Sequence, residues 1–154
     1  CIDGLNDSKK LSEKKREALF DIIKENCIFG IGEAIPAEID EHNILGATMI
    51  AMRRAIEALP EMPSLALIDG NRAKDFPLPG VTIVGGDAKS PSIAAASVLA
   101  KVTRDRECLA LDALYPEYGF AKHKGYPTAE HMAKVREIGP CPVHRRSFLS
   151  FLSK

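Results

Sequence analysis

The sequence predicts an α/β protein in which short strands alternate with helices. Two apolar segments, at residues 64–68 (SLALI) and 81–84 (VTIV), each run into a turn that contains glycine and aspartate, which is typical of strand ends. Apolar residues at three- and four-residue spacing over residues 38–59 and from residue 90 onward predict long amphipathic helices. The 154 residues are enough for one ordinary domain and too few for two.

The N-terminal half of the chain contains three predicted elements before the first of those strands. Ser12 can cap a helix over residues 13–26, with Leu19, Ile22 and Ile23 on one face. Residues 27–33 (CIFGIGE) are short and apolar, and we interpret them as a third strand. The helix predicted over residues 38–59 has a single stripe expected to be buried, formed by Leu45, Met49, Met52, Ile56 and Leu59.

The C-terminal half is predicted to be mainly helical. Ser90 and Pro91 resemble an N-cap followed by proline at the first helical position, and this helix can extend to about residue 113. Its inward side is expected to contain Ala95, Leu99, Val102 and Leu109. We treat residues 115–154 as a C-terminal helical segment of one domain, with a helix over residues 129–138 capped by Thr128.

Composition excludes several classes of protein. The chain is 45% hydrophobic and 27% charged, which is the profile of a globular protein, and no apolar run approaches the roughly 18 residues of a membrane span. No signal peptide is recognisable in the polar first residues, so we expect a cytoplasmic protein with no membrane partner. The four cysteines show no CxxC spacing, and we expect no zinc site. Walker, GxGxxG, GxSxG and HExxH motifs are absent from the sequence.

The charge is balanced overall but unevenly distributed. Twenty-one basic residues match 21 acidic ones, yet residues 1–16 carry a net charge of +2 and residues 119–154 a net charge of +5. The residues between them must then carry −7. Basic ends around an acidic middle suit a polyanion held against a carboxylate site. Ordinary solvated charge explains the same asymmetry, and the asymmetry by itself favours that simpler explanation.

Asp69 and Asp87 occupy matching positions after the two predicted strands. Ligands of α/β sheets bind at the carboxyl ends of strands, so two aspartates there would lie close together. Like charges at short range are unfavourable unless a cation lies between them, and ligand sets made only of oxygen suit Mg²⁺ or Mn²⁺. Each aspartate can also simply begin a turn, and the pattern alone leaves both interpretations open.

Basic residues also gather around a tyrosine near the C-terminus. Residues 122–128 (KHKGYPT) and 144–147 (HRRS) could contact phosphates while the ring of Tyr126 stacks on a sugar or base. The alternative is a solvated loop in which Tyr126 packs against its neighbouring proline. Residues 8–10 (SKK) offer a similar anion-binding patch beside a helix start.

Taken together, these segments resemble one family, bacterial ribonuclease HII. The order of the motifs carries the resemblance over nearly the whole chain: residues 6–11 (NDSKKL), 67–71 (LIDGN), 86–87 (GD), 95–105 (AASVLAKVTRD), 118–120 (YGF), 123–128 (HKGYPT) and 144–148 (HRRSF).

The resemblance implies a ribonuclease H-like fold, with a mixed sheet flanked by helices, and a metal-dependent endonuclease. Such enzymes cut the RNA strand of RNA–DNA hybrids and cut 5′ of single ribonucleotides in DNA, leaving 5′-phosphate ends. Of the family's four carboxylates, Asp69 matches the third and Asp87 the fourth, both as ligands of a two-cation Mg²⁺ or Mn²⁺ site. Tyr126 matches the tyrosine that packs on the sugar beside the ribonucleotide. The expected nucleic-acid contacts are Ser8, Lys9, Lys10, Lys122, Lys124, Tyr126, Arg145 and Arg146.

The sequence departs from the family pattern at its start. The family opens with a strand that carries an Asp-Glu pair and a Gly-Arg-Gly turn, and neither is present, so we expect an N-terminally incomplete chain. With two of four carboxylates, residues 1–154 alone are expected to be inactive and poorly stable. The alternative to the endonuclease is therefore an inactive fragment that retains only nucleic-acid binding. We expect the full-length protein to be monomeric.

Overall fold

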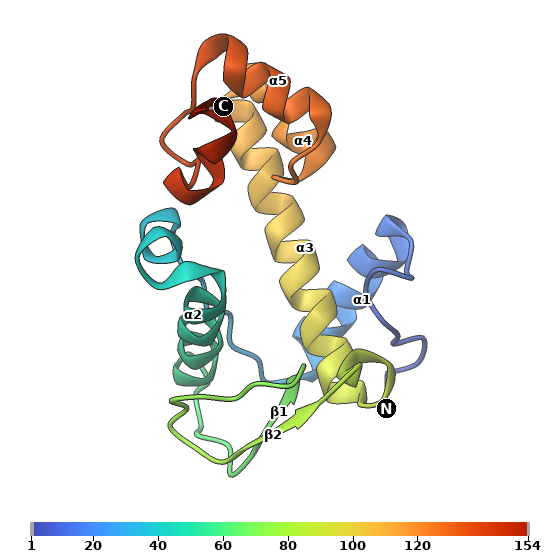
Figure 1. Ribbon diagram of the computed structural model, residues 1–154. Coiled ribbons are helices and arrows are strands. Elements are labelled where there is room, and N and C mark those ends of the chain that lie inside the picture. Colours follow the sequence, from blue (N-terminus) through green and yellow to red (C-terminus); the bar gives the residue numbers. More distant parts are fainter. Residues whose placement is uncertain (1, 154) are drawn as a thin grey trace. The chain divides into compact units, whose positions relative to one another are not determined.

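The structure is a computed structural model that describes residues 2–153, so Cys1 and Lys154 lie outside the described residues (Figure 1). It divides into two compact units. The first runs to Ala34 and continues over Leu45–Val102, and the second combines Ile35–Ile44 with the chain from Thr103 onward. The single domain expected from the sequence, with a C-terminal segment from residue 115, stays a prediction. The C-terminal part of the second unit begins at Thr103.

Helices dominate the secondary structure, as the sequence predicts. In chain order the elements are α1 (Glu13–Asn26), α2 (Pro36–Glu57), β1 (Ala66–Asp69), β2 (Gly80–Ile83), the 3-10 helix η1 (Gly86–Ala88), α3 (Pro91–Leu114), the 3-10 helix η2 (Pro116–Tyr118), α4 (Phe120–His123), α5 (Ala129–Ile138) and the 3-10 helix η3 (Arg146–Ser153). No helix within residues 2–153 is both long and apolar enough to cross a membrane.

The predicted helix caps are confirmed. The hydroxyl of Ser12 accepts a hydrogen bond from the backbone N–H of Lys15 at 3.3 Å, and α1 begins at the next residue after the cap. The hydroxyl of Thr128 likewise accepts from the N–H of His131 at 3.2 Å, at the start of α5. Each hydroxyl satisfies one of the N–H groups that a helix leaves unpaired at its first turn, which explains why these helices begin where they do.

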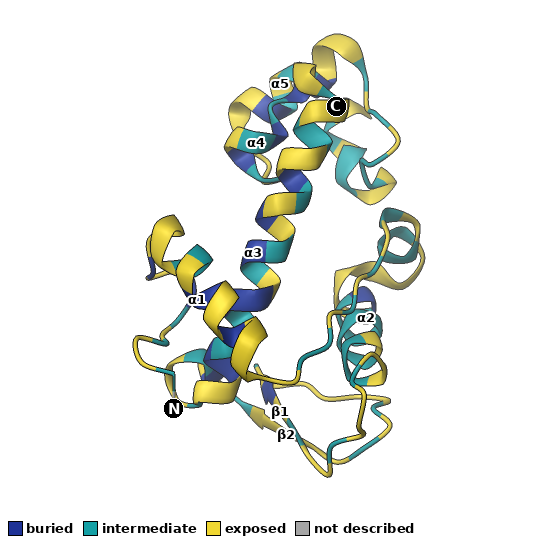
Figure 2. Cartoon of the chain, turned by 180° about the vertical axis from the view of Figure 1, so that it is seen from behind, coloured by how far each residue is buried: buried dark blue, intermediate teal, exposed yellow. Residues whose placement is uncertain are grey.

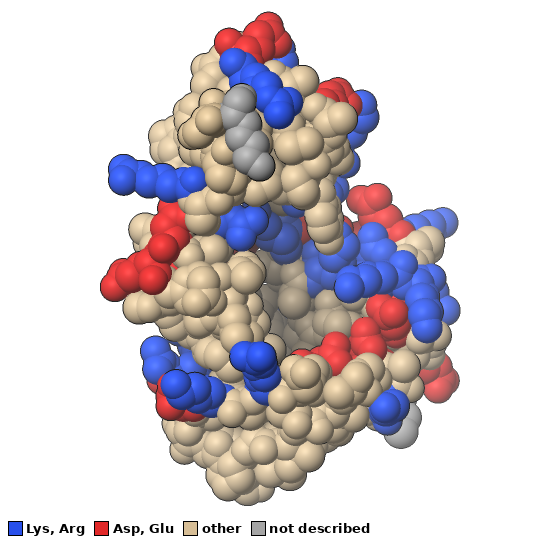
Figure 3. Space-filling view, in the orientation of Figure 1, with Lys and Arg blue, Asp and Glu red and all other residues tan. Residues whose placement is uncertain are grey.

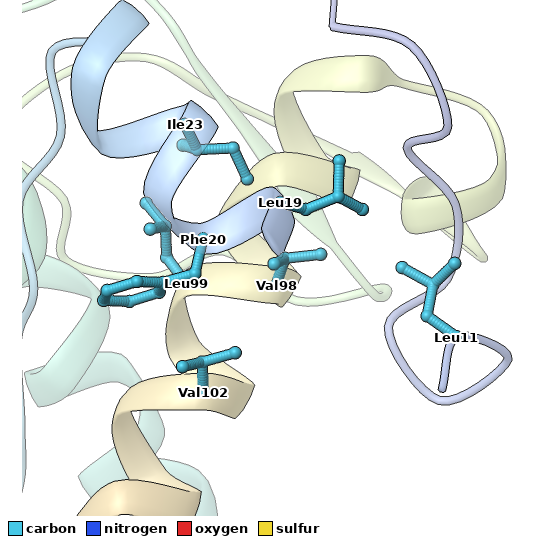
Figure 4. Packing of buried hydrophobic residues seen from close by; sticks show 7 residues of the cluster. All are labelled: Leu11, Leu19, Phe20, Ile23, Val98, Leu99 and Val102. Atoms are coloured by element: carbon cyan, nitrogen blue, oxygen red, sulfur yellow. The ribbon is translucent and has the colours of Figure 1, made fainter. Parts of the chain in front are cut away.

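The core of the first unit lies between α1 and the N-terminal half of α3, which run beside each other (Figure 1). Figure 4 shows its members, which are Leu11, Leu19, Phe20, Ile23, Val98, Leu99 and Val102. The predicted inward residues Leu99 and Val102 belong to it, but Leu109 is 49% exposed. Ile22 is also 42% exposed, so only part of each predicted apolar face is covered.

The sheet consists of β1 and β2, which pair in parallel. Leu67 pairs with Val81, and Asp69 pairs with Ile83. Both strands fall within two residues of the predicted segments, but the described residues contain a parallel pair and not the mixed sheet that we expected. Most of this sheet is exposed, as its yellow colour in Figure 2 shows, and Ile68 is its one buried residue.

The strand predicted over residues 27–33 is wrong. These residues join α1 to α2 without pairing to either strand. Gly30 and Gly32 press the segment against the backbone of α2, where a Cβ on Gly32 would lie 2.1 Å from the carbonyl oxygen of Ala51. The alternation of glycine and apolar residues therefore reflects close packing against a helix and not a sheet ladder.

The helix predicted over residues 38–59 exists, but its predicted buried stripe is wrong. Asn43 interrupts α2 with a φ of 58°, and the only buried residue of the helix is Ala47. Leu45, the first member of the stripe, is 40% exposed. The glycine-containing segment over residues 27–33 lies along the small side chains of Ala51 and Ala55, because only small residues allow such a close approach.

The second unit has its own core around the aromatic residues that follow α3. Tyr118, Phe120 and Val135 are buried, and partly buried apolar side chains pack around them. The rings of Tyr118 and Phe120 stack with centroids 5.8 Å apart. The hydroxyl of Tyr118 donates to the carbonyl oxygen of Gly139 at 2.8 Å, which ties η2 to the end of α5.

Candidate active site and nucleic-acid interface

Asp69 and Asp87 follow the two paired strands at the same end of the sheet. Asp69 is the last residue of β1, and Asp87 lies in η1, four residues beyond the end of β2. The Oδ1 atom of Asp69 accepts a hydrogen bond from the backbone N–H of Gly86 at 2.8 Å. The carboxylate of Asp69 is therefore tied to the residue that precedes Asp87, as the parallel pairing of the strands requires.

Gly86 is buried at this contact, and a side chain there would have to displace the end of the Ile93 side chain. A Cβ on Gly86 would lie 2.6 Å from the Cδ1 atom of Ile93 and 3.4 Å from the Oδ1 atom of Asp69. The glycine thus allows its N–H to reach the carboxylate while η1 packs against the first turn of α3. Sequence reasoning used Gly86 as part of a turn and of a family motif, and missed this hydrogen bond.

A pocket of about 400 Å³ lies beside Asp87. One wall is η1 and the start of α3, with Asp87, Lys89 and Ser90. The other wall is the N-terminal segment, which contributes Asp3 and Asn6. The ammonium group of Lys89 donates to the carbonyl oxygen of Val84 at 2.7 Å, so this lysine braces the turn between β2 and η1.

The donor set at this end of the sheet fits a hard divalent cation. Both candidate ligands are carboxylates, Asp69 is exposed and Asp87 half-buried, so a cation can reach them from solvent. One oxygen of Asp69 accepts the Gly86 N–H, which fixes the orientation of the carboxylate. Within residues 2–153, no group of three or more His, Cys, Asp or Glu side chains is placed to hold a metal ion.

The loop over residues 7–11 presents two of the predicted contacts to solvent. Asp7 closes the loop, since its Oδ1 atom accepts from the N–H of Lys9 at 2.9 Å. The guanidinium of Arg16 donates to the carbonyl oxygens of Ser8 and Leu11. As a result Ser8 is only 6% exposed, while Lys9 and Lys10 are exposed. Figure 3 shows basic side chains gathered over this N-terminal segment and α1.

The second unit presents the other predicted basic loop. Lys122 is exposed and forms an ion pair with Glu130 of α5, and this hydrogen bond lowers the pKa of the Glu130 carboxyl. Lys124 is half-buried and adopts a left-handed conformation that ends α4, with a φ of 52°. Tyr126 is 61% exposed, so its ring is available to pack on a ligand and does not contribute to the core.

The predicted arginines lie at the start of η3. The backbone N–H groups of Arg146 and Ser147 both donate to the carboxylate of Asp40, each at 2.8 Å. These hydrogen bonds lower the pKa of the Asp40 carboxyl, and those from Ser147 have the largest effect. The guanidinium of Arg145 lies over the ring of Phe148, 5.8 Å from its centroid. Arg146 is exposed and Arg145 half-buried.

The predicted site residues are divided between the two units. Asp69, Asp87 and the lysines of residues 9–10 belong to the first unit, and Tyr126 and the remaining basic residues belong to the second. Sequence reasoning missed Arg16 and the buried His131, which both bind backbone carbonyls of predicted contact loops. The signal in the sequence that could have pointed to His131 is that three of the four histidines fall within residues 123–144.

Known proteins match this arrangement over almost the whole chain. The family model described as Ribonuclease HII matches residues 3–151. Among solved structures, the ribonuclease H2 from Pyrococcus horikoshii OT3 is similar, with 25% sequence identity and a TM-score of 0.74. The alignment covers 97% of this chain and 79% of that chain. The predicted ribonuclease H-like α/β fold is confirmed by this match.

Proposed function

Because this chain belongs to the ribonuclease HII family, we propose that it provides the site of a metal-dependent endonuclease acting on RNA–DNA hybrids and on DNA with single embedded ribonucleotides. Family and fold support ribonuclease activity in general. The observation that supports the specific site is the placement of Asp69 and Asp87 after paired parallel strands, with Asp69 bonded to Gly86. The proposed products carry 5′-phosphate and 3′-hydroxyl ends.

Asp69 and Asp87 are the residues that would hold Mg²⁺ or Mn²⁺. When bound at such carboxylates, divalent cations supply Lewis-acid stabilisation of the attacking and leaving oxygens of a phosphodiester. The contribution of the chain is to position the two aspartates for cation binding. Asp69 is oriented by the Gly86 N–H, and Asp87 is held in η1 against the first turn of α3. The Gly86 N–H holds the Asp69 carboxylate in place before the substrate arrives, which is the general advantage of a preorganised site.

The basic loops are proposed to hold the nucleic acid. Lys9 and Lys10 are exposed in a loop braced by Arg16, so they can contact phosphates while the buried Ser8 fixes the loop's backbone. Lys122, Lys124, Arg145 and Arg146 form the second proposed set of phosphate contacts. The exposed ring of Tyr126 lies within that set in sequence and is proposed to pack on the sugar beside the ribonucleotide.

A second candidate function is nucleic-acid binding without cleavage. The sequence matches the third and fourth carboxylates of the family pattern and not the first two. The basic loops do not depend on those carboxylates, so affinity for a hybrid can persist where hydrolysis does not. We further propose that the protein acts as a monomer in the cytoplasm, in DNA replication and repair.

A cleavage and binding assay distinguishes the two candidates. Residues 1–154 are incubated with an RNA–DNA hybrid, with a duplex containing one ribonucleotide and with an all-DNA duplex, in Mg²⁺ or Mn²⁺. Cleavage would support the endonuclease, and binding without cleavage would support the second candidate for this stretch of chain. With only two of the family's four carboxylates matched, we expect residues 1–154 to bind the hybrid and not to cut it. Metal-dependent cleavage that Asp69→Asn abolishes would show that two carboxylates suffice for catalysis. Absence of any preference for the ribonucleotide-containing substrates over plain DNA would contradict both candidates.

A further inference from the structure

The second unit contains a chain of three imidazoles, two of them buried and one half-buried, beneath the loop that carries Tyr126. His123 and His131 are buried, and their rings stack with centroids 3.9 Å apart. The Nε2 atom of His131 lies 2.9 Å from the Nε2 atom of His144. The Nδ1 atom of His131 lies 2.9 Å from the carbonyl oxygen of Tyr126. This connected set of hydrogen bonds ends on the residue proposed to contact the nucleic-acid sugar.

The partners fix the position of every proton in this chain. A carbonyl oxygen can only accept, so the Nδ1 atom of His131 carries a hydrogen and donates to Tyr126. In a neutral ring the Nε2 atom of His131 is then an acceptor, and the Nε2 atom of His144 must donate to it. The remaining nitrogen of His144, Nδ1, is left as an acceptor, and it accepts the backbone N–H of Cys141 at 3.1 Å.

A charged imidazole does not fit the same contacts. A hydrogen added to the Nε2 atom of His131 would point at the N–H of His144. A hydrogen added to the Nδ1 atom of His144 would displace the backbone N–H of Cys141 from that nitrogen, leaving only the Sγ atom of Cys141, 3.1 Å away, as a weak acceptor. The neighbouring ring obeys the same rule, because His123 accepts from the N–H of Gly125 at 3.1 Å and donates to the carbonyl of Tyr118 at 2.8 Å. All the contacts of His131 and His144, the N–H of Cys141 included, are satisfied together only when these two rings are neutral.

From this geometry we propose that His131 and His144 are positioning residues, which hold the main chain at Tyr126 through a neutral relay of hydrogen bonds running from Cys141. The carbonyl of Tyr126 accepts two hydrogen bonds, from His131 and from the N–H of Thr128 at 2.9 Å. Its side chain stays 61% exposed. The relay therefore fixes the backbone below the ring while leaving the ring on the surface, and its role in substrate binding rests on the proposed function of Tyr126.

The relay is tested first in the free chain by ¹⁵N NMR of the histidine side chains at pH 7.5. The expected result is a hydrogen on Nδ1 of His131 and a hydrogen on Nε2 of His144, with both rings neutral. A hydrogen on Nε2 of His131, or a charged ring at either position, would overturn the proposal. This measurement needs no substrate, so it decides the relay even if the protein binds no nucleic acid.

Two substitutions at one position then separate positioning from packing. His131→Asn places an amide N–H where Nδ1 stands and keeps the donor to Tyr126, whereas His131→Gln places its amide where Nε2 stands and loses that donor. Both remove the same buried ring, so both are expected to lower the melting temperature. We expect the Gln variant to bind a hybrid roughly threefold to tenfold more weakly than the Asn variant, which corresponds to one hydrogen bond. The exposed His42 provides a control, since His42→Asn should bind as the wild type does.

Amide hydrogen exchange at Tyr126 provides the readout that separates this proposal from the proposed function. Exchange is expected to be faster in the Gln variant than in the Asn variant, because only the Gln variant removes one of the two hydrogen bonds to the carbonyl of Tyr126 and so loosens the main chain there. If exchange differs in this way and wild-type protein binds no hybrid, the proposed function fails and the relay stands. Equal exchange and equal affinity in the two variants would show that His131 only fills space, and would overturn the proposal.

Discussion

At the residue scale, the candidate metal site depends on how Asp69 is held. Its carboxylate accepts a backbone hydrogen bond from Gly86 and is exposed to solvent. A hydrogen bond to a carboxylate restricts its rotation, so less conformational freedom is lost when a cation binds. Asp87, in η1, lies one residue beyond Gly86. The hydrogen bond thus orients the Asp69 carboxylate beside the residue that precedes Asp87.

Replacing Asp69 by asparagine should weaken cation binding without disturbing the fold. Asparagine keeps an oxygen that can accept the Gly86 N–H but removes the negative charge. We expect the affinity for Mn²⁺, measured by isothermal titration calorimetry, to fall by at least about tenfold, since even outer-shell changes have effects of that order. Asp75→Asn is the matched control, because Asp75 is exposed in a turn where asparagine is well tolerated. An equal loss in both variants would indicate a diffuse charge effect and no site.

The buried histidines predict how stability depends on pH. Burial lowers the pKa of both His131 and His144 below the ordinary value of 6.5, and the neighbouring imidazoles act in the same direction. The other titratable groups against these rings are His123 and Cys141, and burial raises the pKa of the Cys141 thiol, so it stays neutral. The folded state thus binds fewer protons here than the unfolded state. The contribution of these two histidines to the free energy of unfolding is fully present above about pH 6.5. It is lost as the pH falls through their lowered pKa values.

Thermal melting between pH 8 and pH 5 measures this dependence. The wild-type melting temperature should drop as the pH falls below about 6.5, the unperturbed histidine value. His131→Asn removes one of the two buried groups and should give a shallower drop. His42→Asn, at an exposed histidine, should retain the wild-type profile. A wild-type melting temperature that is constant, or that rises toward acid, would contradict neutral buried rings.

At the element scale, α2 shows how backbone contact can replace side-chain burial. The segment over residues 27–33 lies against this helix through Gly30 and Gly32, and the guanidinium of Arg54 donates to the carbonyl of Glu33 at 2.7 Å. Larger side chains of the helix, such as Leu45, remain substantially exposed as a result. The position of α2 in the first unit therefore depends on two glycines.

Gly32→Ala should destabilise the first unit strongly. The added methyl would lie 2.1 Å from the carbonyl oxygen of Ala51 and 2.3 Å from the backbone nitrogen of Ala55, and backbone atoms cannot move aside as a flexible side chain can. We expect a loss of about 1–3 kcal/mol or more in the free energy of unfolding measured by urea denaturation. Ile28→Ala, in the same segment but at a residue 69% exposed, should change it by less than about 0.5 kcal/mol. Similar losses in both variants would argue that the segment does not pack as described.

At the scale of the whole molecule, the basic residues proposed to hold nucleic acid are divided between the two units. Lys9 and Lys10 belong to the first unit, and Lys122 and Lys124 to the second. Each lysine that neutralises a phosphate releases bound counterions, which makes affinity depend on salt. If both loops contact the same ligand, the two units act together on one substrate.

The salt dependence of hybrid binding tests both loops. Lys9→Gln with Lys10→Gln, and separately Lys122→Gln with Lys124→Gln, should each weaken binding and reduce the slope of log affinity against log salt by roughly one per lost phosphate contact. Lys74→Gln with Lys134→Gln removes the same charge at lysines paired with Asp75 and Glu137, outside the proposed loops. This control should leave the slope nearly unchanged. A slope that is the same in all three double variants would place the nucleic acid on another surface.

The sequence by itself determined the helices, the two strands and the family. Ser12 and Thr128 predicted helix starts because capping is local chemistry, encoded within four residues. The pattern of a strand followed by an aspartate predicted the positions of Asp69 and Asp87 near the strand ends, because strand ends are also marked by local residues. The ordered motifs predicted the family, because a series of matches in order carries far more information than any one of them.

Only the tertiary structure decided what each local pattern packs against. Residues 27–33 have the composition of a strand, but the approach of Ala51 and Ala55 makes them a close-packed connection. His131 and Arg16 look like ordinary polar residues of helices in sequence, yet they bind the backbone of the loops that carry Tyr126 and Lys9. Such contacts join residues by distance in space and not by spacing in the chain, so no periodicity or motif records them.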